Sequence, residues 1–144
     1  MPMFRPAEER AVREHLADLA RPVELALVLG PEEEPVPGAR DIDFSAEARR
    51  LLEELVALGD GRLTLSVHED GALGAERFPA ICVFPDGADP GVRYYGLPWG
   101  YELTSLVGAC VEAGRAEPSL AAESLEALDA LPRDVSIDVF VTPT

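Results

Sequence analysis

The sequence predicts an α/β domain built on a mixed sheet, followed by the opening helix and strand of a second unit of the same class. Helical and strand patterns alternate along the 144 residues, and the first strand pattern, residues 23–29, is nearly all apolar, as in strands covered on both faces. Residues 133–143, RDVSIDVFVTP, resemble residues 21–31, RPVELALVLGP. We therefore expect one complete unit over residues 1–115 and a truncated second unit over residues 116–144.

The segments on either side of the first strand predict a helix and a loop. Val12, Leu16 and Leu19 recur at i, i+4 and i+7, which is the spacing of an amphipathic helix. Pro22 ends this helix, because proline cannot continue the hydrogen-bond ladder. Residues 30–40 contain three prolines and a run of three glutamates, so we expect an exposed acidic loop there. Such a run is more typical of a solvated loop than of a cation site.

Three further helices follow from apolar residues at helical spacing. The second helix is expected to begin at an N-cap, Asp43 or Ser45, and to end at Gly59. A third is expected over residues 98–114 and a fourth over residues 119–131. The apolar stripe of the second helix, which we expect to face the sheet, consists of Ala48, Leu51, Leu52, Leu55, Val56 and Leu58.

Three further strands complete the predicted sheet of the first unit. Residues 63–67 form one strand, and residues 80–84 form another that opens after the pair Phe78 and Pro79. Residues 92–95 follow a turn rich in Pro, Asp and Gly, which predicts an antiparallel hairpin with the preceding strand. The alternating apolar residues of the segment 135–141 predict the first strand of the second unit.

The composition excludes two classes of partner. The chain has 27 Asp and Glu against 12 Lys and Arg, a net charge of -15, which repels nucleic-acid backbones and anionic membranes. It has no apolar run of about 20 residues, the length of a membrane-spanning helix. Its N-terminus lacks the apolar region of a signal peptide. We therefore expect a cytoplasmic protein that binds neither nucleic acid nor membranes.

Few residues suggest chemistry. Cys82 lies in an apolar strand and Cys110 on an apolar helix face, so we expect inert buried thiols rather than a disulfide or a redox role. His15 and His68 have no His or Cys partner at ligand spacing, which predicts surface histidines and no metal site. Ser45 has no His or Asp arranged to activate it. We expect no cofactor.

Aromatic residues gather between the last predicted strand of the first unit and its third helix. They are Tyr94, Tyr95, Trp99 and Tyr101. Core packing is the default expectation for such residues, and a surface for a partner is the alternative.

Three motifs carry a family resemblance. Residues 78–84, FPAICVF, stand where the thioredoxin-like fold has its cis-proline strand. Residues 91–102, GVRYYGLPWGYE, resemble the G-V-R-Y-x-G-[IL]-P-x-G-H-E stretch of tandem thioredoxin-fold protein disulfide oxidoreductases, which are also called glutaredoxin-like proteins. Residues 139–144, VFVTPT, are similar to the segment that leads into the C-P-x-C site of the second unit in that family. A similar redox-inactive unit begins the alkyl hydroperoxide reductase flavoprotein subunit.

The resemblance implies a thioredoxin-like three-layer fold, a cis Phe78–Pro79 bond and thiol–disulfide exchange with protein disulfide clients, which would bind at Phe78 and Pro79. The chain departs from the family at its first site, because the two cysteine positions fall near Ile42 and Ser45 and no cysteine is present there. The second site would follow Thr144. We therefore expect no catalytic residue and no activity in this chain alone.

The main functional expectation is a redox-inactive N-terminal part of a protein disulfide oxidoreductase. The alternatives are a non-catalytic interaction or dimerisation module, or the N-terminal domain of a peroxide-reductase flavoprotein. A free apolar strand at residues 135–141 invites pairing with another chain, so we also expect a homodimer.

Overall fold

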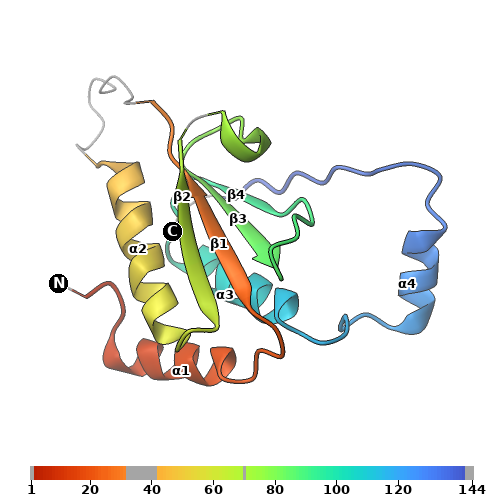
Figure 1. Ribbon diagram of the computed structural model, residues 1–144, viewed down its shortest axis with the longest axis horizontal. Coiled ribbons are helices and arrows are strands. Elements are labelled where there is room, and N and C mark those ends of the chain that lie inside the picture. Colours follow the sequence, from red (N-terminus) through yellow and green to blue (C-terminus); the bar gives the residue numbers. More distant parts are fainter. Residues whose placement is uncertain (1, 32–41, 70, 142–144) are drawn as a thin grey trace.

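The computed structural model describes residues 2–31, 42–69 and 71–141, and these form a mixed four-stranded sheet with helices packed against it (Figure 1). The sheet order is β2-β1-β3-β4. Strand β1 pairs in parallel with β2 and antiparallel with β3, and β3 pairs antiparallel with β4. The elements are α1 (Pro6–Leu16), β1 (Val23–Val28), α2 (Phe44–Leu58), β2 (Leu63–His68), the 3-10 helix η1 (Ala72–Gly74), β3 (Ala80–Pro85), β4 (Arg93–Tyr95), α3 (Tyr101–Ala113) and α4 (Ala122–Asp129).

Strand β1 is central and buried on both faces, as its apolar sequence predicts. Val23, Leu25 and Leu27 face the main core, and Ala26 and Val28 face a second, smaller cluster. Helices α1, α2 and α3 all contribute to the main core, on one face of the sheet. The buried side chains of these helices in the main core are Leu16, Ala48, Leu51, Leu52, Leu55, Leu58, Leu106, Val107 and Cys110.

The other face of the sheet has a much thinner cover. Its buried cluster consists of Ala26, Val28, Ala80, Cys82 and Phe84. The partly buried residues packed against this cluster come from η1 and the segment after it, and they are Ala72, Leu73, Ala75 and Phe78. No α-helix contributes a buried side chain to this cluster in the described part of the chain. A short irregular segment therefore covers the part of this face that β1 and β3 form.

The ends of α2 explain why this helix occupies the predicted residues. Asp43 is the N-cap, and its Oδ1 accepts a hydrogen bond from the Ala46 backbone N–H at 2.9 Å. The cap is thus Asp43, and Ser45 lies inside the helix. At the other end the Gly59 N–H donates to the Val56 carbonyl at 3.0 Å. Both capping groups satisfy backbone atoms that the helix leaves without partners.

The C-terminal residues differ from the expectation. Helix α4 is shorter than the predicted residues 119–131, and the described residues that follow it form no strand. A strand needs a hydrogen-bonded neighbour, and residues 135–141 have none within the described ranges, so the predicted strand is wrong for this structure. Their side chains stay in solvent; Ile137 is 81% exposed and Phe140 82%. Figure 1 shows α4 standing away from the sheet.

The acidic loop expected over residues 30–40 lies almost entirely outside the described residues. None of the helices in the described ranges combines the length and the apolar character that a membrane crossing requires.

Candidate functional site

The cis-proline position is the centre of the candidate site. The Phe78–Pro79 peptide bond is cis, as the family resemblance implies. Pro79 is buried, and its carbonyl accepts a hydrogen bond from the Gly96 N–H at 2.8 Å. Because Gly96 follows β4, this bond joins the beginning of β3 to the end of β4. The pair Phe78 and Pro79 therefore sits at one end of the sheet.

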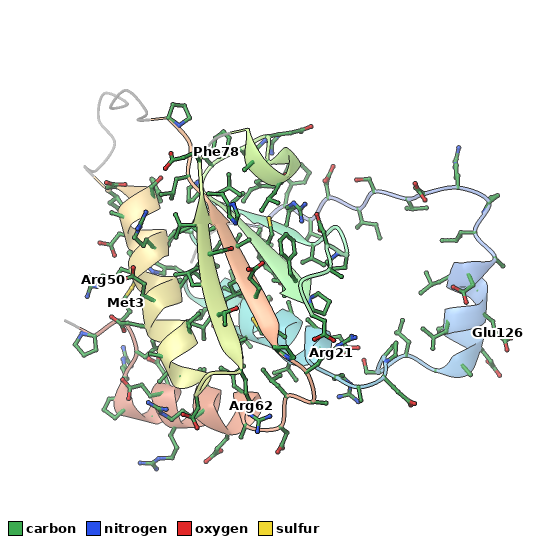
Figure 2. All side chains as sticks on the ribbon, viewed as in Figure 1. Met3, Arg21, Arg50, Arg62, Phe78 and Glu126 are labelled. Atoms are coloured by element: carbon green, nitrogen blue, oxygen red, sulfur yellow. The ribbon has the colours of Figure 1, made fainter. Side chains whose placement is uncertain are left out.

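Phe78 also reaches the end of β1. A Cβ atom at Gly30, two residues beyond β1, would lie 2.5 Å from the Phe78 ring, so only glycine fits there. The Phe78 side chain is half-buried and packs against the second cluster. Figure 2 shows it at the end of the sheet where β1 ends. The structure thus brings the cis-proline segment and the end of β1 together.

No thiol lies at this junction. The only cysteines in the sequence are Cys82 and Cys110, and both are free and buried. The positions that a dithiol would occupy, Ile42 and Ser45, flank the Asp43 cap of α2 instead. The N-terminus of α2, where the helix dipole would stabilise a thiolate, therefore holds a carboxylate.

The two buried cysteines are poor nucleophiles. Burial raises the pKa of Cys110 to about 12. Burial also raises the pKa of Cys82, although the nearby Arg93 guanidinium opposes this effect. Cys82 lies in the second cluster and Cys110 in the main core, so the sheet separates their side chains. The prediction of inert buried thiols agrees with this placement.

Arg93 ties together three segments around the second cluster. Its Nη1 donates to Asp89 Oδ1 at 2.9 Å, and its Nη2 donates to the Leu73 carbonyl at 3.0 Å. The guanidinium carbon stands 5.8 Å from the centre of the Phe84 ring, within the range of a cation–π contact. Arg93 therefore holds η1 against the β3–β4 hairpin. No sequence pattern singled out this role, although Arg93 lies in the GVRY motif.

The aromatic residues divide between core and surface. Tyr94 is half-buried against the main core, and its hydroxyl donates to the Ser105 carbonyl at 3.1 Å. Tyr95 and Trp99 are 43% and 41% exposed, and Tyr101 is 84% exposed. Core packing is therefore confirmed for Tyr94 and wrong for Tyr101, because α3 begins at Tyr101 and turns this ring into solvent. Tyr95 is paired with Ala80, directly beside the cis-proline segment.

A second feature lies at the opposite end of the sheet. A groove of about 380 Å³ opens between the β3–β4 hairpin and the C-terminal half of α3. Its walls are mostly apolar, with one cation and one carboxylate, and they consist of Arg21, Val83, Pro85, Pro90, Val92, Ala109, Glu112, Ala113 and Pro118. Arg21 is fixed at the wall because its Nε donates to the Ala113 carbonyl at 2.9 Å. Figure 2 shows Arg21 at the far end of the sheet from Phe78.

The histidines form no metal centre in the described ranges. His15 is exposed, and His68 is partly buried with its Nε2 2.9 Å from Ser66 Oγ. The described residues contain no group of three or more His, Cys, Asp or Glu side chains placed to hold a metal ion.

Sequence comparison relates the chain to AhpF, the F component of alkyl hydroperoxide reductase. No family model matches the chain. It is 36% identical over 109 residues to AhpF of Xanthomonas campestris pv. phaseoli, and the match covers 74% of this chain and 20% of the relative. It is 33% identical over 114 residues to AhpF of Escherichia coli, covering 79% of this chain and 19% of the relative. The chain spans about a fifth of the length of these curated relatives.

Structural comparison gives the same relationship. An N-terminal-domain fragment of AhpF from Enterococcus faecalis matches with a TM-score of 0.74 at 25% identity, covering 90% of this chain and 62% of that one. A protein disulfide oxidoreductase from Aeropyrum pernix matches with a TM-score of 0.70 at 23% identity, covering 91% of this chain and 56% of that one.

The chain is a thioredoxin-like domain related to the N-terminal domain of AhpF. Its fold also matches that of the archaeal protein disulfide oxidoreductase. The curated relatives favour the peroxide-reductase alternative over the disulfide oxidoreductase that the sequence motifs suggested first. The roles of Phe78 and Pro79 in client binding and the boundary near residue 115 remain predictions.

Proposed function

We propose that the chain is a redox-inactive thioredoxin-like unit from the N-terminal domain of a peroxide-reductase flavoprotein, where it acts as a scaffold and docking surface. The observation that carries this proposal is the absence of a thiol beside the cis-proline. Ile42 and Ser45 stand where a redox-active relative of this fold would need its two cysteines, and Asp43 between them caps α2. The relationship to AhpF supplies the class of parent protein.

Thiol chemistry supports an inactive unit. Exchange with a disulfide begins with attack by a thiolate, so the attacking cysteine must be both ionised and accessible. Cys110 has a pKa of about 12 and is fully buried. A thiol with that pKa is ionised in about one molecule in 10⁵ at pH 7. Cys82 is buried too, and burial raises its pKa.

Insulin-disulfide reduction with dithiothreitol tests this proposal. We expect residues 1–144 to give no more turbidity than dithiothreitol alone. The double variant Ile42→Cys with Ser45→Cys places a dithiol at the start of α2, and a gain of activity there would show that only the thiols are missing. Catalysis by the unmodified chain that Cys82→Ala or Cys110→Ala abolishes would overturn the proposal.

A second candidate is the N-terminal part of a protein disulfide oxidoreductase. Its support is the fold match to the Aeropyrum pernix protein and the VFVTPT motif at residues 139–144. In that protein the active dithiol would follow Thr144 and exchange with protein disulfide clients in the cytoplasm. The present chain would then contribute scaffold and part of the client surface.

The coding sequence after Thr144 separates these candidates. A Cys-Pro-x-Cys motif without a flavin domain supports the disulfide oxidoreductase, whereas a flavin domain farther along supports the peroxide-reductase flavoprotein. A stop codon supports an independent interaction module. A UGA codon has two readings, termination or selenocysteine, and the intact mass of the protein from its native source distinguishes them.

A further inference from the structure

Residues 71–77, which we call the strap, cover the second cluster and touch little else. The strap contains η1, and its partly buried side chains Ala72, Leu73 and Ala75 pack against that cluster. None of the described strap residues packs against the main core, which lies on the other face of the sheet. Displacing the strap would therefore uncover the second cluster and leave the packing of α1, α2 and α3 intact.

The strap has few hydrogen bonds to the sheet. Within the described residues a single one joins the two, in which Arg93 Nη2 donates to the Leu73 carbonyl at 3.0 Å. The Ala72 N–H donates to the Glu69 carbonyl, and the Ala75 N–H donates to a carbonyl of the strap itself. One side chain on β4 is therefore the latch that holds the strap to the sheet.

The two ends of the strap differ in how firmly they are held. Gly71 begins it with a φ of 81°, in the left-handed region that glycine tolerates, and an added Cβ there would meet nothing within 4 Å. Beyond the other end, the Phe78 ring packs into the space beside Gly30. The next residue is held too, since its carbonyl accepts the hydrogen bond from the Gly96 N–H at 2.8 Å. The strap is therefore free to turn at Gly71 and is fixed at Phe78.

The closed strap contains an unfavourable backbone conformation. Leu73 has a φ of 54° and a ψ of 20°, in the left-handed region where a residue with a Cβ atom is strained. The packing of its side chain on the second cluster and the hydrogen bond from Arg93 to its carbonyl hold it there. An open strap would lose these contacts and release the strain. Opening therefore costs less free energy than the contacts alone imply.

We propose that the strap opens over the second cluster as a local unit while the main core stays folded. Proteins open locally, at free energies well below that of global unfolding, where few buried apolar contacts hold a segment. Opening exposes the apolar face that β1 and β3 form, together with the Cys82 thiol, which is fully buried when the strap is closed. Cys110 stays buried in the main core, so the two thiols report on two different openings. This inference goes beyond the proposed function and does not depend on it.

Labelling of both cysteines in the same molecule tests the opening. Residues 1–144 react with iodoacetamide at about pH 8, near the ordinary pKa of a thiol, and trypsin then releases the two thiols on separate peptides, residues 78–93 and 94–115. We expect labelling of Cys82 to be at least about tenfold faster than labelling of Cys110. Urea below the unfolding transition should leave the Cys82 rate almost unchanged, because local opening exposes little surface, and should raise the Cys110 rate steeply. A Cys82 rate that is no faster than that of Cys110, or that rises as steeply with urea, would overturn the proposal.

Two variants show whether the strap is the part that moves. Leu73→Ala removes the largest apolar side chain of the strap and should raise the Cys82 rate by a factor of about three to thirty without changing the Cys110 rate. Val67→Ala is the matched control, because Val67 is an apolar residue of β2 that is 39% exposed and pairs with Leu27 on the main-core face. This control should leave the Cys82 rate unchanged. If Leu73→Ala left it unchanged as well, fraying of the β3–β4 hairpin would be what exposes Cys82, and the proposal would be wrong.

Discussion

The ring of Phe78 occupies the space in which residue 30 would carry a side chain. A Cβ at Gly30 would stand 2.5 Å from the nearest atoms of Phe78, a distance that real side chains do not tolerate. The contact joins the residue before the cis-proline to the segment that follows β1. In this unit an aromatic side chain therefore fills the space beside the end of β1.

The first prediction concerns this contact. Gly30→Ala should lower the free energy of unfolding by about 1–3 kcal/mol, because the ring or the backbone must move to admit a methyl group. Urea denaturation measures the change. Gly108→Ala is the matched control, since an added Cβ at this exposed position in α3 meets nothing within 4 Å. That control should gain about 0.5–1 kcal/mol from helix propensity. Equal effects at both positions would contradict the close approach.

The second prediction concerns the cover over the second cluster. Arg93→Ala removes the hydrogen bonds to Asp89 and to the Leu73 carbonyl, and this should cost about 1–3 kcal/mol of unfolding free energy. Because η1 then loses its tie to the hairpin, a thiol reagent should label Cys82 faster than in the unmodified chain.

Arg115→Ala is the control for this experiment. The side chains of Arg115 and its ion-pair partner Glu112 are both 48% exposed, so the pair contributes little to stability. Labelling of Cys82 should be unchanged in this variant. If Arg93→Ala left the labelling rate unchanged as well, the guanidinium would not be what holds η1 in place.

The third prediction is a loss of stability at alkaline pH. The pKa of Cys110 is about 12 in the folded chain, above the ordinary thiol value of about 8.5. The unfolded chain therefore releases this proton first. The stabilisation is fully present below about pH 8.5 and falls by up to about 1.4 kcal/mol per pH unit as the pH rises toward 12.

Urea denaturation at pH 7 and pH 10.5 measures this loss. Burial also raises the pKa of Cys82 and of Tyr94, so these groups contribute in the same direction. Cys110→Ala should be less stable than the unmodified chain at pH 7 because of the cavity, and it should lose less stability between the two pH values. An identical pH dependence in both proteins would exclude Cys110 as a source.

The sequence predicts the first unit well because its elements are strongly patterned. The strand over residues 23–29 and the stripe of α2 each bury a continuous apolar face, and Asp43 and Gly59 mark the ends of α2 with capping chemistry. The strand predicted over residues 135–141 is absent from the described structure for a different reason. Val135 and Ile137 alternate as in a strand, but a strand exists only with a neighbour, and local sequence does not supply one.

The candidate site was less accessible to sequence reasoning. The cis-proline position followed from the motif at residues 78–84, but the contact of Phe78 with Gly30 depends on how two distant segments meet. The role of Arg93 likewise depends on η1, a segment with a positive φ at Leu73 that no periodic pattern describes. Tyr101 was expected in the core and is exposed instead. The sequence near the start of a helix does not indicate whether its first side chain points to the core or to solvent.

The carboxylate at the start of α2 has a consequence for how the unit behaves in a cell. A dithiol at this point would change its charge, its bonding and its shape whenever it was oxidised or reduced. Asp43 keeps one charge and one hydrogen bond through the whole range of cellular redox conditions. The start of α2 therefore presents the same cap under oxidising and reducing conditions.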